Sequence, residues 1–256
     1  MIIWGMVGNS HDASLAVFVD NKLAWASLSK DFSDVPNDPD FNWTQLEVAK
    51  QSYGLPDKVI WYERPFLKTL RQFAAGQGWL AKENNIKKYL NKWGINCPIE
   101  YIDHHESHAA YGYYTSGFQD ATIICIDSIG EFETFTIWNG TGTQIKKVYR
   151  QKYPHSIGLF YSAMTQRCGL KANAEEYILS DYAIKGDRYA YLDAIEKDFT
   201  DQKMLKNGFW QVRFKENLHR GCNWWRPELQ SEKELIDIGA STQEAFERMM
   251  MRISTS

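Results

Sequence analysis

Several features that mark whole classes of protein are missing from this sequence. The four cysteines (Cys97, Cys125, Cys168 and Cys222) lie far apart without a C-x-x-C pair, so we expect reduced thiols, with neither a disulfide framework nor a zinc ribbon. The 29 basic and 32 acidic residues nearly balance, which leaves no overall positive charge to attract nucleic acid or an anionic membrane. No apolar run approaches the ~18 to 20 residues of a membrane span, and the N-terminus lacks the basic start of a signal peptide. These absences predict a soluble, cytoplasmic protein without membrane or nucleic-acid partners.

The first part of the chain has the pattern of an antiparallel meander that continues into alternating helices and strands. Apolar runs at 2–7, 13–19 and 23–28, separated by Asn, Asp and Gly, predict three strands, and the proline-containing segment 33–41 predicts a loop. The elements expected next are a helix at 43–53, a strand at 59–62, a helical region at 66–93 interrupted near Gly76 and Gly78, a strand at 98–102 and a further helix. Antiparallel strands extended by parallel ones through helical crossovers form the ribonuclease-H-like α/β layout.

A similar pattern begins again at Ala121. The expected elements are strands at 121–126, 132–138 and 143–149, an acidic turn at 127–131 and a hairpin turn at Asn139-Gly140. Two such units, packed together, form the fold of actin, hexokinase and the heat-shock chaperones, in which the acidic turns of both halves face a cleft for phosphate or nucleotide. The sequence therefore predicts a duplicated ribonuclease-H-like α/β fold of the actin/hexokinase ATPase type, with subdomains at 1–120 and 121–256.

The second unit departs from the first after its third strand. Ser156 is expected to cap a helix, a mixed segment rich in aromatic and charged residues is inserted at about 171–230, and a terminal helix covers 232–252. The later strands of the first unit have no counterpart here, which would leave a strand edge open to another chain. We expect the second half-domain to stop before its last strands and to be completed by a second polypeptide or a missing C-terminal region, against which Trp224 and Trp225 pack.

Three of the six histidines lie in the run DHHESH at 103–108. On a helix, His104 and His108 share a face, so both imidazoles can reach one cation. Two histidines and one carboxylate suit non-haem iron or a similar divalent metal. The candidate carboxylate is Asp127, at the end of the strand that opens the second unit. The alternative is a plain helix start that Asp103 caps, with His105 and His108 exposed to solvent.

Other polar residues near strand ends are further candidates. His11 and Asp12, in the turn between the first two strands, could contact phosphate or orient an acceptor, or could form a simple Asx-capped turn. Gly130 and Glu131 offer backbone amides and a carboxylate at the start of the second unit, or a plain hairpin. The sequence has no Walker A loop and no G-x-S-x-G elbow.

Six longer stretches carry a family resemblance. They are GNSHDASLAVF at 8–18, YERP at 62–65, IDHHESHAAYGYYTSGF at 102–118, IDSIGEFET at 126–134, PHSIGLFYSAMTQRCGLKANAEEY at 154–177 and IGASTQEAFERMM at 238–250. In this order they resemble the motifs of the nodulation-type carbamoyltransferases, among which His–His–x–x–His–Ala–Ala is fairly specific. The resemblance covers nearly the whole chain and indicates the N-terminal, metal-binding half of that family.

This resemblance implies a transferase that moves a carbamoyl group onto a hydroxyl of a small-molecule acceptor. The donor would be a carbamoyl-adenylate, made from carbamoyl phosphate and ATP in a separate nucleotide-binding domain, so the chain is expected to be incomplete as an enzyme. A divalent metal, iron or else zinc, would act as a Lewis acid. The residues that the resemblance assigns are the metal ligands His104, His108 and Asp127, a base that is His11 or Asp12, and the substrate- or nucleotide-binding residues Ser128, Gly130 and Glu131.

The sequence also departs from the family's pattern. Ser128 stands where the family usually has glycine, which makes a positive φ at that turn costlier. The stretch 178–183 lacks the lysine and the glycine of the family, and the family's Gly–Gly nucleotide loop and fourth ligand would lie beyond Ser256. Two other functions are therefore considered: a non-catalytic binding or scaffold relative that needs a partner chain, and a simple hydrolase that uses the same metal site.

Overall fold

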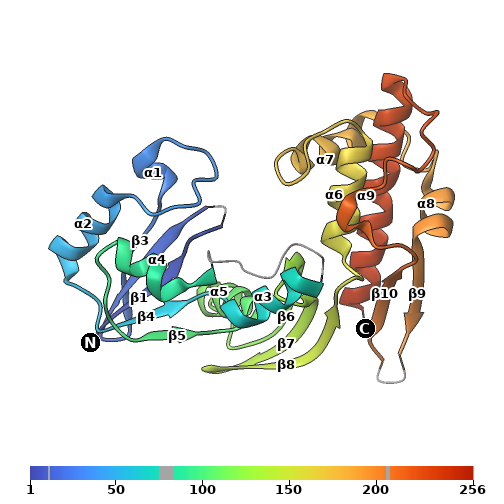
Figure 1. The fold of residues 1–256 in the computed structure, drawn as a ribbon. Coiled ribbons are helices and arrows are strands. Elements are labelled where there is room, and N and C mark those ends of the chain that lie inside the picture. The colour runs from blue at the N-terminus through green and yellow to red at the C-terminus, as the bar shows by residue number, and fades with distance from the viewer. Residues whose placement is uncertain (11, 75–83, 206–207, 256) are drawn as a thin grey trace. The chain divides into compact units, whose positions relative to one another are not determined.

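The computed structural model describes residues 1–10, 12–74, 84–205 and 208–255 (Figure 1). Contacts between residues divide the chain into two units, Met1–Ala110 and Tyr111–Ser256. The sequence places its boundary ten residues later, between 120 and 121. The two boundaries differ because the contacts assign the second half of helix α5 (His104–Ser116) to the second unit. The division therefore falls inside one helix.

The first unit contains a five-stranded mixed sheet. β1 pairs antiparallel with β2 and parallel with β4, β3 extends the antiparallel side, and β5 extends the parallel side, in the order β3-β2-β1-β4-β5. The strands are β1 (Ile2–Val7), β2 (Ser14–Val19), β3 (Lys22–Leu28), β4 (Lys58–Trp61) and β5 (Ile99–Tyr101). An antiparallel meander of three strands extended by parallel strands is the layout that the sequence predicts for the first unit; the order of the strands comes from the structure.

The helices of this unit follow its strands in the chain, and two of them begin at capping side chains and bury apolar residues with the sheet. They are α1 (Lys30–Ser33), α2 (Trp43–Tyr53), α3 (Pro65–Ala74) and α4 (Ile86–Lys92). Asn42 and Asn85 cap α2 and α4 through side-chain oxygens that accept backbone N–H bonds of 2.8 and 3.0 Å. The core includes Trp4, Leu15, Trp61 and Leu90. The predicted helical region at 66–93 is divided into α3 and α4, and its two glycines lie outside the described residues.

The second unit begins with a three-stranded antiparallel sheet in the order β6-β7-β8. Its strands are β6 (Asp120–Gly130), β7 (Glu133–Thr141) and β8 (Gln144–Lys152). The predicted acidic turn at 127–131 is largely wrong, because β6 continues to Gly130 through a bulge and leaves only Glu131 and Phe132 in the turn. In the described residues, β6 pairs only with β7, and this sheet gains no parallel strand.

The predicted hairpin turn at Asn139-Gly140 is also wrong. Both residues lie inside β7, and the turn is formed by Gly142 and Thr143, with Gly142 at a φ of 60°. Gly140 lies in the strand because the ring of Tyr113 on α5 occupies the space where a side chain would stand. Gly140 therefore leaves space for the Tyr113 ring, whereas Gly142 forms the turn.

The remainder of the second unit packs around α6 and α9, which Figure 1 shows side by side with α7. Its elements are α6 (Ile157–Arg167), α7 (Glu176–Lys185), α8 (Leu192–Phe199), the hairpin β9 (Thr200–Met204) and β10 (Trp210–Phe214), a short 3-10 helix (Leu218–Arg220) and α9 (Glu232–Ser254). Phe160, Leu179, Ile195 and Val212 form part of one buried core. The segment predicted as an insertion at 171–230 is therefore an integral part of this core.

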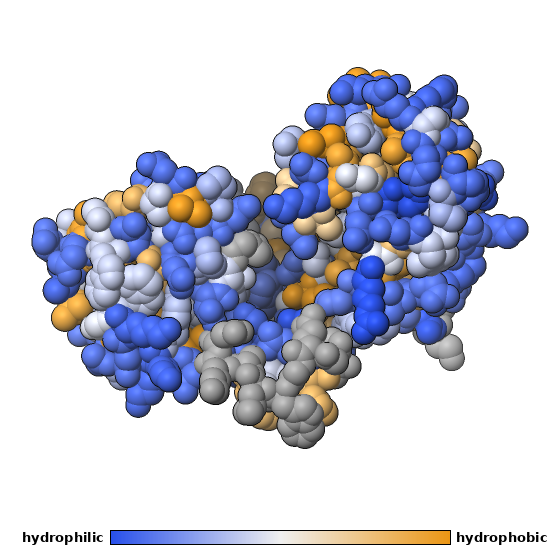
Figure 2. All heavy atoms as spheres, turned by 45° about the horizontal axis from the view of Figure 1, so that its top comes forward, coloured by the Kyte–Doolittle hydropathy of each residue, from blue (hydrophilic) through white to orange (hydrophobic). Residues whose placement is uncertain are grey.

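Trp225 corrects another prediction, that the tryptophan pair packs against a missing part of the protein. Its side chain is only 3% exposed within this unit, and its indole N–H donates to Asp198 Oδ2 at 3.0 Å. Trp224 stays largely exposed, with its ring beside that of Phe199. On the face drawn in Figure 2, hydrophobic patches stand among hydrophilic surface. None of the helices in the described ranges has both the length and the apolar character needed to cross a bilayer.

Candidate metal centre

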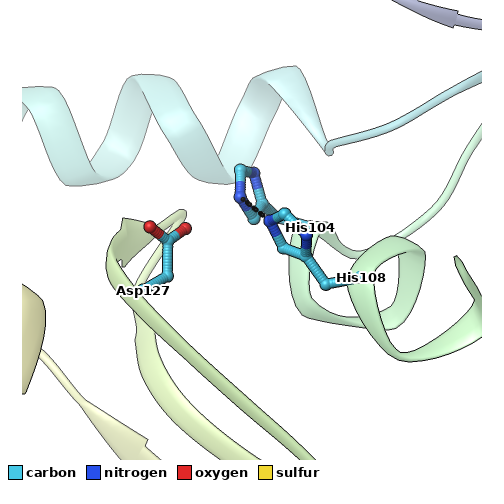
Figure 3. A group of neighbouring side chains, drawn as sticks. All are labelled: His104, His108 and Asp127. Atoms are coloured by element: carbon cyan, nitrogen blue, oxygen red, sulfur yellow. Dashed lines mark hydrogen bonds between the residues drawn. The ribbon is translucent and has the colours of Figure 1, made fainter. Parts of the chain in front are cut away.

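Two imidazoles and one carboxylate from neighbouring elements gather at one point. His104 and His108 lie one turn apart on α5, and their Nε2 atoms are 3.0 Å apart. Asp127 comes from β6, the strand that follows this helix in the chain. One ligand atom from each residue lies within 4.8 Å of the other two (Figure 3). The spacing of i and i+4 on a helix is the reason that both rings point the same way.

Helix α5 is fixed by tyrosines in its second half. The Tyr113 hydroxyl lies 2.6 Å from the Gln119 carbonyl oxygen and 3.1 Å from that of Gly142, and the Tyr114 hydroxyl donates to the Thr143 carbonyl at 2.9 Å. These bonds join the helix to the start of β6 and to the β7–β8 turn. His104 and His108 lie in the first half of the same helix.

The polypeptide around His104 is held by residues of the first unit. The ring of Tyr62, just after β4, meets the His104 ring edge-on, with centroids 5.5 Å apart. Arg64 forms an ion pair with Asp103, the residue before the helix. His105 is only 1% exposed, so the alternative of a plain helix start with His105 in solvent is wrong, whereas His108 is exposed as that alternative expected.

Asp127 lies in the bulge of β6. The register with β7 shifts between Ile126 and Gly130, which lies opposite Glu133, so Asp127 stands in an irregular stretch of the strand. The Asp127 carboxylate accepts a hydrogen bond of 2.6 Å from the backbone N–H of Ser128. A bulge of this kind re-aims a side chain, here toward the histidines.

One cysteine, Cys125, lies on the same strand two residues before Asp127. Burial raises the pKa of its thiol, and the negative charge of Asp127 acts in the same direction. The thiol is therefore neutral at physiological pH. The grouping of possible metal ligands in the described residues does not include this thiol and consists of two imidazoles and one carboxylate.

The other predicted site residues are distributed as follows. His11 lies outside the described residues, and Asp12 occupies the β1–β2 turn with a left-handed φ of 55°. Gly130 ends β6, and Glu131 follows with a φ of 54° and a side chain only 7% exposed. The conformational cost expected at Ser128 does not arise, because the positive φ at this turn belongs to Glu131.

Sequence reasoning assigned no role at this site to three residues that contact it. Tyr62 touches His104, whereas Ser156 and Gly158, at the start of α6, touch the backbone of Asp127 and Ser128. All three lie in stretches that carry the family resemblance, in YERP and in PHSIG. The family resemblance could have pointed to these residues, but it did not show which residues are in contact in the folded protein.

Comparison with known proteins places the chain in a family. The sequence profile described as "Carbamoyltransferase N-terminus" matches residues 10–254, so the chain belongs to the carbamoyltransferase N-terminal family. The predicted resemblance to the nodulation-type carbamoyltransferase family is confirmed.

The chain is similar in sequence to several known proteins and in structure to a solved one. It is 27% identical to the protein sll1178 of Synechocystis over 99% of its length and 48% of that protein. It is 28% identical to the nodulation protein NolNO of Sinorhizobium fredii, over 60% of this chain and 23% of that one, and 29% identical to NolO of Bradyrhizobium diazoefficiens, over 58% and 27%. It is also similar to the Ppx/GppA phosphatase of Aquifex aeolicus, with a TM-score of 0.37, 11% identity and coverage of 99% and 93%. The chain spans 48% of the length of the Synechocystis protein, and the matches cover 23% of NolNO and 27% of NolO.

Proposed function

We propose that this chain supplies the metal-binding part of a carbamoyltransferase that modifies a hydroxyl group of a small molecule. Membership in the carbamoyltransferase N-terminal family supports the reaction class. The observation that carries the proposal is the grouping of His104, His108 and Asp127 within 4.8 Å. Two imidazoles beside a carboxylate are the kind of donors that a catalytic divalent metal needs.

The donor set fits a divalent transition metal. Two neutral imidazoles and one carboxylate leave coordination positions open, a set typical of non-haem iron, and zinc accepts the same donors. His104, His108 and Asp127 would hold the ion. When bound, it would supply Lewis-acid polarisation of a carbamoyl or phosphate oxygen. We propose iron first and zinc as the alternative.

The reaction proposed for the complete enzyme is attack of an acceptor hydroxyl on a carbamoyl-adenylate, which would be made from carbamoyl phosphate and ATP. Water would first cleave carbamoyl phosphate to carbamate and inorganic phosphate, and a carbamate oxygen would then attack the α-phosphorus of ATP, with pyrophosphate as the leaving group. The hydroxyl oxygen forms a bond to the carbamoyl carbon, the bond from that carbon to the adenylate phosphate oxygen breaks, and AMP leaves. The hydroxyl proton passes to a base, for which His11 and Asp12 are the candidates. Ser128, Gly130 and Glu131, beside Asp127 in the chain, are proposed to contact the donor.

We also propose that a second polypeptide, or a further C-terminal region, completes the fold as a duplicated ribonuclease-H-like pair and forms the adenylate. The edge of β6 supports this view. β1 pairs on both edges, with β2 and β4, whereas β6 pairs on one edge only within the described residues. The four free cysteines agree with a reducing, cytoplasmic location.

Metal content tests the site. Protein purified anaerobically and incubated with Fe²⁺ or Zn²⁺ should retain metal after desalting, and His104→Ala combined with His108→Ala should abolish it. His219→Ala is the matched control, since His219 lies on the 3-10 helix (Leu218–Arg220), outside the grouping. Unchanged metal content in the double variant would reject the assignment.

Nucleotide products test the reaction. With carbamoyl phosphate, ATP and the completing polypeptide, pyrophosphate should be released, and AMP release should depend on a hydroxyl acceptor and on His104 and His108. Full turnover by this chain alone would contradict the need for a second polypeptide. Metal binding without any AMP release in the completed system would instead favour the non-catalytic binding relative.

A further inference from the structure

We propose that the first turn of α6 is a positioning device for Asp127, in which Ser156 and Gly158 hold the backbone of the β6 bulge so that the carboxylate meets the histidines. The inference rests on the proposed metal site and adds to it two residues that do not touch the ion. It is drawn from contacts within the second unit, between the start of α6 and the backbone at 127–128.

Ser156 makes three hydrogen bonds at once. Its hydroxyl lies 3.1 Å from the carbonyl oxygen of Asp127 and 2.7 Å from that of Ser128, and the same oxygen accepts the backbone N–H of Leu159 at 3.0 Å. The last bond is an ordinary N-cap. The first two tie the cap to the residue that carries the proposed ligand. Ser156 is only 1% exposed, so water cannot readily replace these bonds.

The bulge explains why such a tie is needed. Between Ile126 and Gly130 the register of the β6–β7 ladder shifts, so regular strand pairing alone does not set the backbone direction at Asp127. The two carbonyl groups that the Ser156 hydroxyl contacts both lie in this irregular stretch. These contacts fix the direction from which the Asp127 side chain leaves the strand.

Gly158 makes the contact close. A Cβ atom at this position would lie 2.7 Å from the Ser128 nitrogen and 2.8 Å from both the carbonyl carbon and the carbonyl oxygen of Asp127. These neighbours are backbone atoms, which cannot turn aside as the end of a flexible side chain can. Glycine is therefore required for the α6 turn to lie directly against the Asp127–Ser128 peptide.

The segment before Ser156 is anchored to the strand opposite the bulge. The carbonyl oxygen of His155 accepts a 2.6 Å hydrogen bond from the Thr134 hydroxyl and a 3.0 Å bond from the Gln151 side-chain amide. Thr134 lies in β7 between Glu133 and Phe135, where the register shifts. Both sides of the bulge are thus connected to the start of α6, and the position of Asp127 depends on that helix.

Loss of a cap that only stabilises its helix should leave metal binding unchanged, whereas loss of a cap that also positions Asp127 should weaken it. A second capping serine in the chain is the matched control. Ser231 caps α9 in the same way, with its hydroxyl accepting the Glu234 N–H at 3.4 Å and forming a full capping box. Ser156→Ala and Ser231→Ala should both destabilise the protein, because each removes a helix cap. Only Ser156→Ala should change the metal site.

The experiment is a titration of the apo-protein with Co²⁺, followed by its visible absorption and by calorimetry. Partners of metal ligands typically contribute 10- to 100-fold to affinity, so we expect Ser156→Ala to weaken Co²⁺ binding at least about tenfold and to alter the d–d spectrum. Gly158→Ala should do the same through steric displacement. Ser231→Ala, and Gly239→Ala in α9, should stay within about twofold of the parent. Circular dichroism and a cooperative thermal transition establish that each variant is folded.

Each result decides one question. If Ser156→Ala and Ser231→Ala bind Co²⁺ with equal affinity and give the same spectrum, the positioning role is overturned. If Ser156→Ala does not fold, Gly158→Ala decides the question, and unchanged Co²⁺ binding by that variant overturns the role. The variant with both His104→Ala and His108→Ala separates this inference from the proposed function. If that variant binds Co²⁺ as the parent does, the metal site itself is wrong; if it loses binding while the α6 variants keep it, only the positioning role is wrong.

Discussion

The ring of Tyr113 lies against the backbone of Gly140, so closely that a Cβ atom on the glycine would come within 2.4 Å of the tyrosine Cε2. The contact joins the second half of α5 to the end of β7, the central strand of the three-stranded sheet. The Tyr113 hydroxyl reaches the carbonyl groups of Gln119, just before β6, and of Gly142, in the β7–β8 turn. The first half of the same helix bears His104 and His108.

Gly140→Ala should therefore destabilise the protein. The added methyl group has no space below the Tyr113 ring, and overpacking of this kind costs about 1–3 kcal/mol. The free energy of unfolding in urea measures the effect, which should be accompanied by weaker metal binding. A loss below about 0.5 kcal/mol would mean that the ring moves aside freely.

Gly112→Ala should have the opposite effect on stability. Gly112 lies in the interior of α5, and a Cβ atom there would have no neighbour within 4 Å. Alanine is favoured over glycine in an exposed helix interior by about 0.5–1 kcal/mol. We expect a gain of that size in the free energy of unfolding, with metal affinity unchanged. A decrease in stability would show that this surface is covered by something else.

Asp127→Asn should reduce the stabilisation that metal confers. A ligand that binds only the folded state raises the melting temperature by an amount that grows with the logarithm of its concentration divided by Kd, so tighter binding gives a larger shift. A neutral amide is a poorer ligand for a divalent cation than a carboxylate. Saturating Zn²⁺ should raise the melting temperature of the parent clearly and that of Asp127→Asn much less. Asp120→Asn, at the exposed start of the same strand, is the control and should behave as the parent does.

His155 should make the stability of the apo-protein depend on pH. Burial lowers the pKa of its imidazole, with the nearby Arg213 charge adding to the effect, and its Nδ1 accepts a 3.3 Å hydrogen bond from the Phe214 N–H. As the pH falls below the ordinary histidine value of about 6.5, the unfolded chain takes up a proton first. Stability should therefore fall from about pH 6.5 downward, until the folded-state pKa is passed.

Substitution at the same residue isolates this contribution. His155→Asn keeps an acceptor near the position of Nδ1 but does not titrate in this range. Urea unfolding between pH 7.5 and 5, with a chelator present, should show a shallower loss of stability for the variant than for the parent. Parallel curves for the two proteins would rule out His155 as the source.

Arg167→Met should be strongly destabilising. The Arg167 side chain is 4% exposed, and its guanidinium donates to the carbonyl oxygens of Trp225 at 2.7 Å, Arg226 at 2.5 Å and Leu229 at 2.9 Å. Removing these donors leaves buried acceptors without partners, at a cost of about 1–3 kcal/mol or more. Arg167→Lys should recover only part of the loss, because an ammonium group lacks the planar fork. Equal stability of all three proteins in urea would refute this role.

Local sequence was sufficient where the structure depends on neighbours in the chain. The apolar runs predicted β1 and β2, Ser156 predicted the start of α6, and the i, i+4 spacing placed His104 and His108 on one face of a helix. Each of these depends on strand or helix periodicity or on a side chain that bonds to a backbone group three residues away, and such relations are contained in a short segment.

Tertiary structure decided the features that depend on contacts between distant segments. Asn139-Gly140 has the local chemistry of a turn, yet it stays in β7 because Tyr113, far away in the chain, fills the space beside it. Trp225, predicted to face a partner, is buried by its own unit. Residues 127–129 look like a turn but form a bulge of β6, and Ser156 and Gly158 of the distant α6 segment contact its backbone. The sequence by itself determined which chemical groups are present and how they repeat; which groups meet was decided by packing, since burial and close contact depend on segments that only folding brings together.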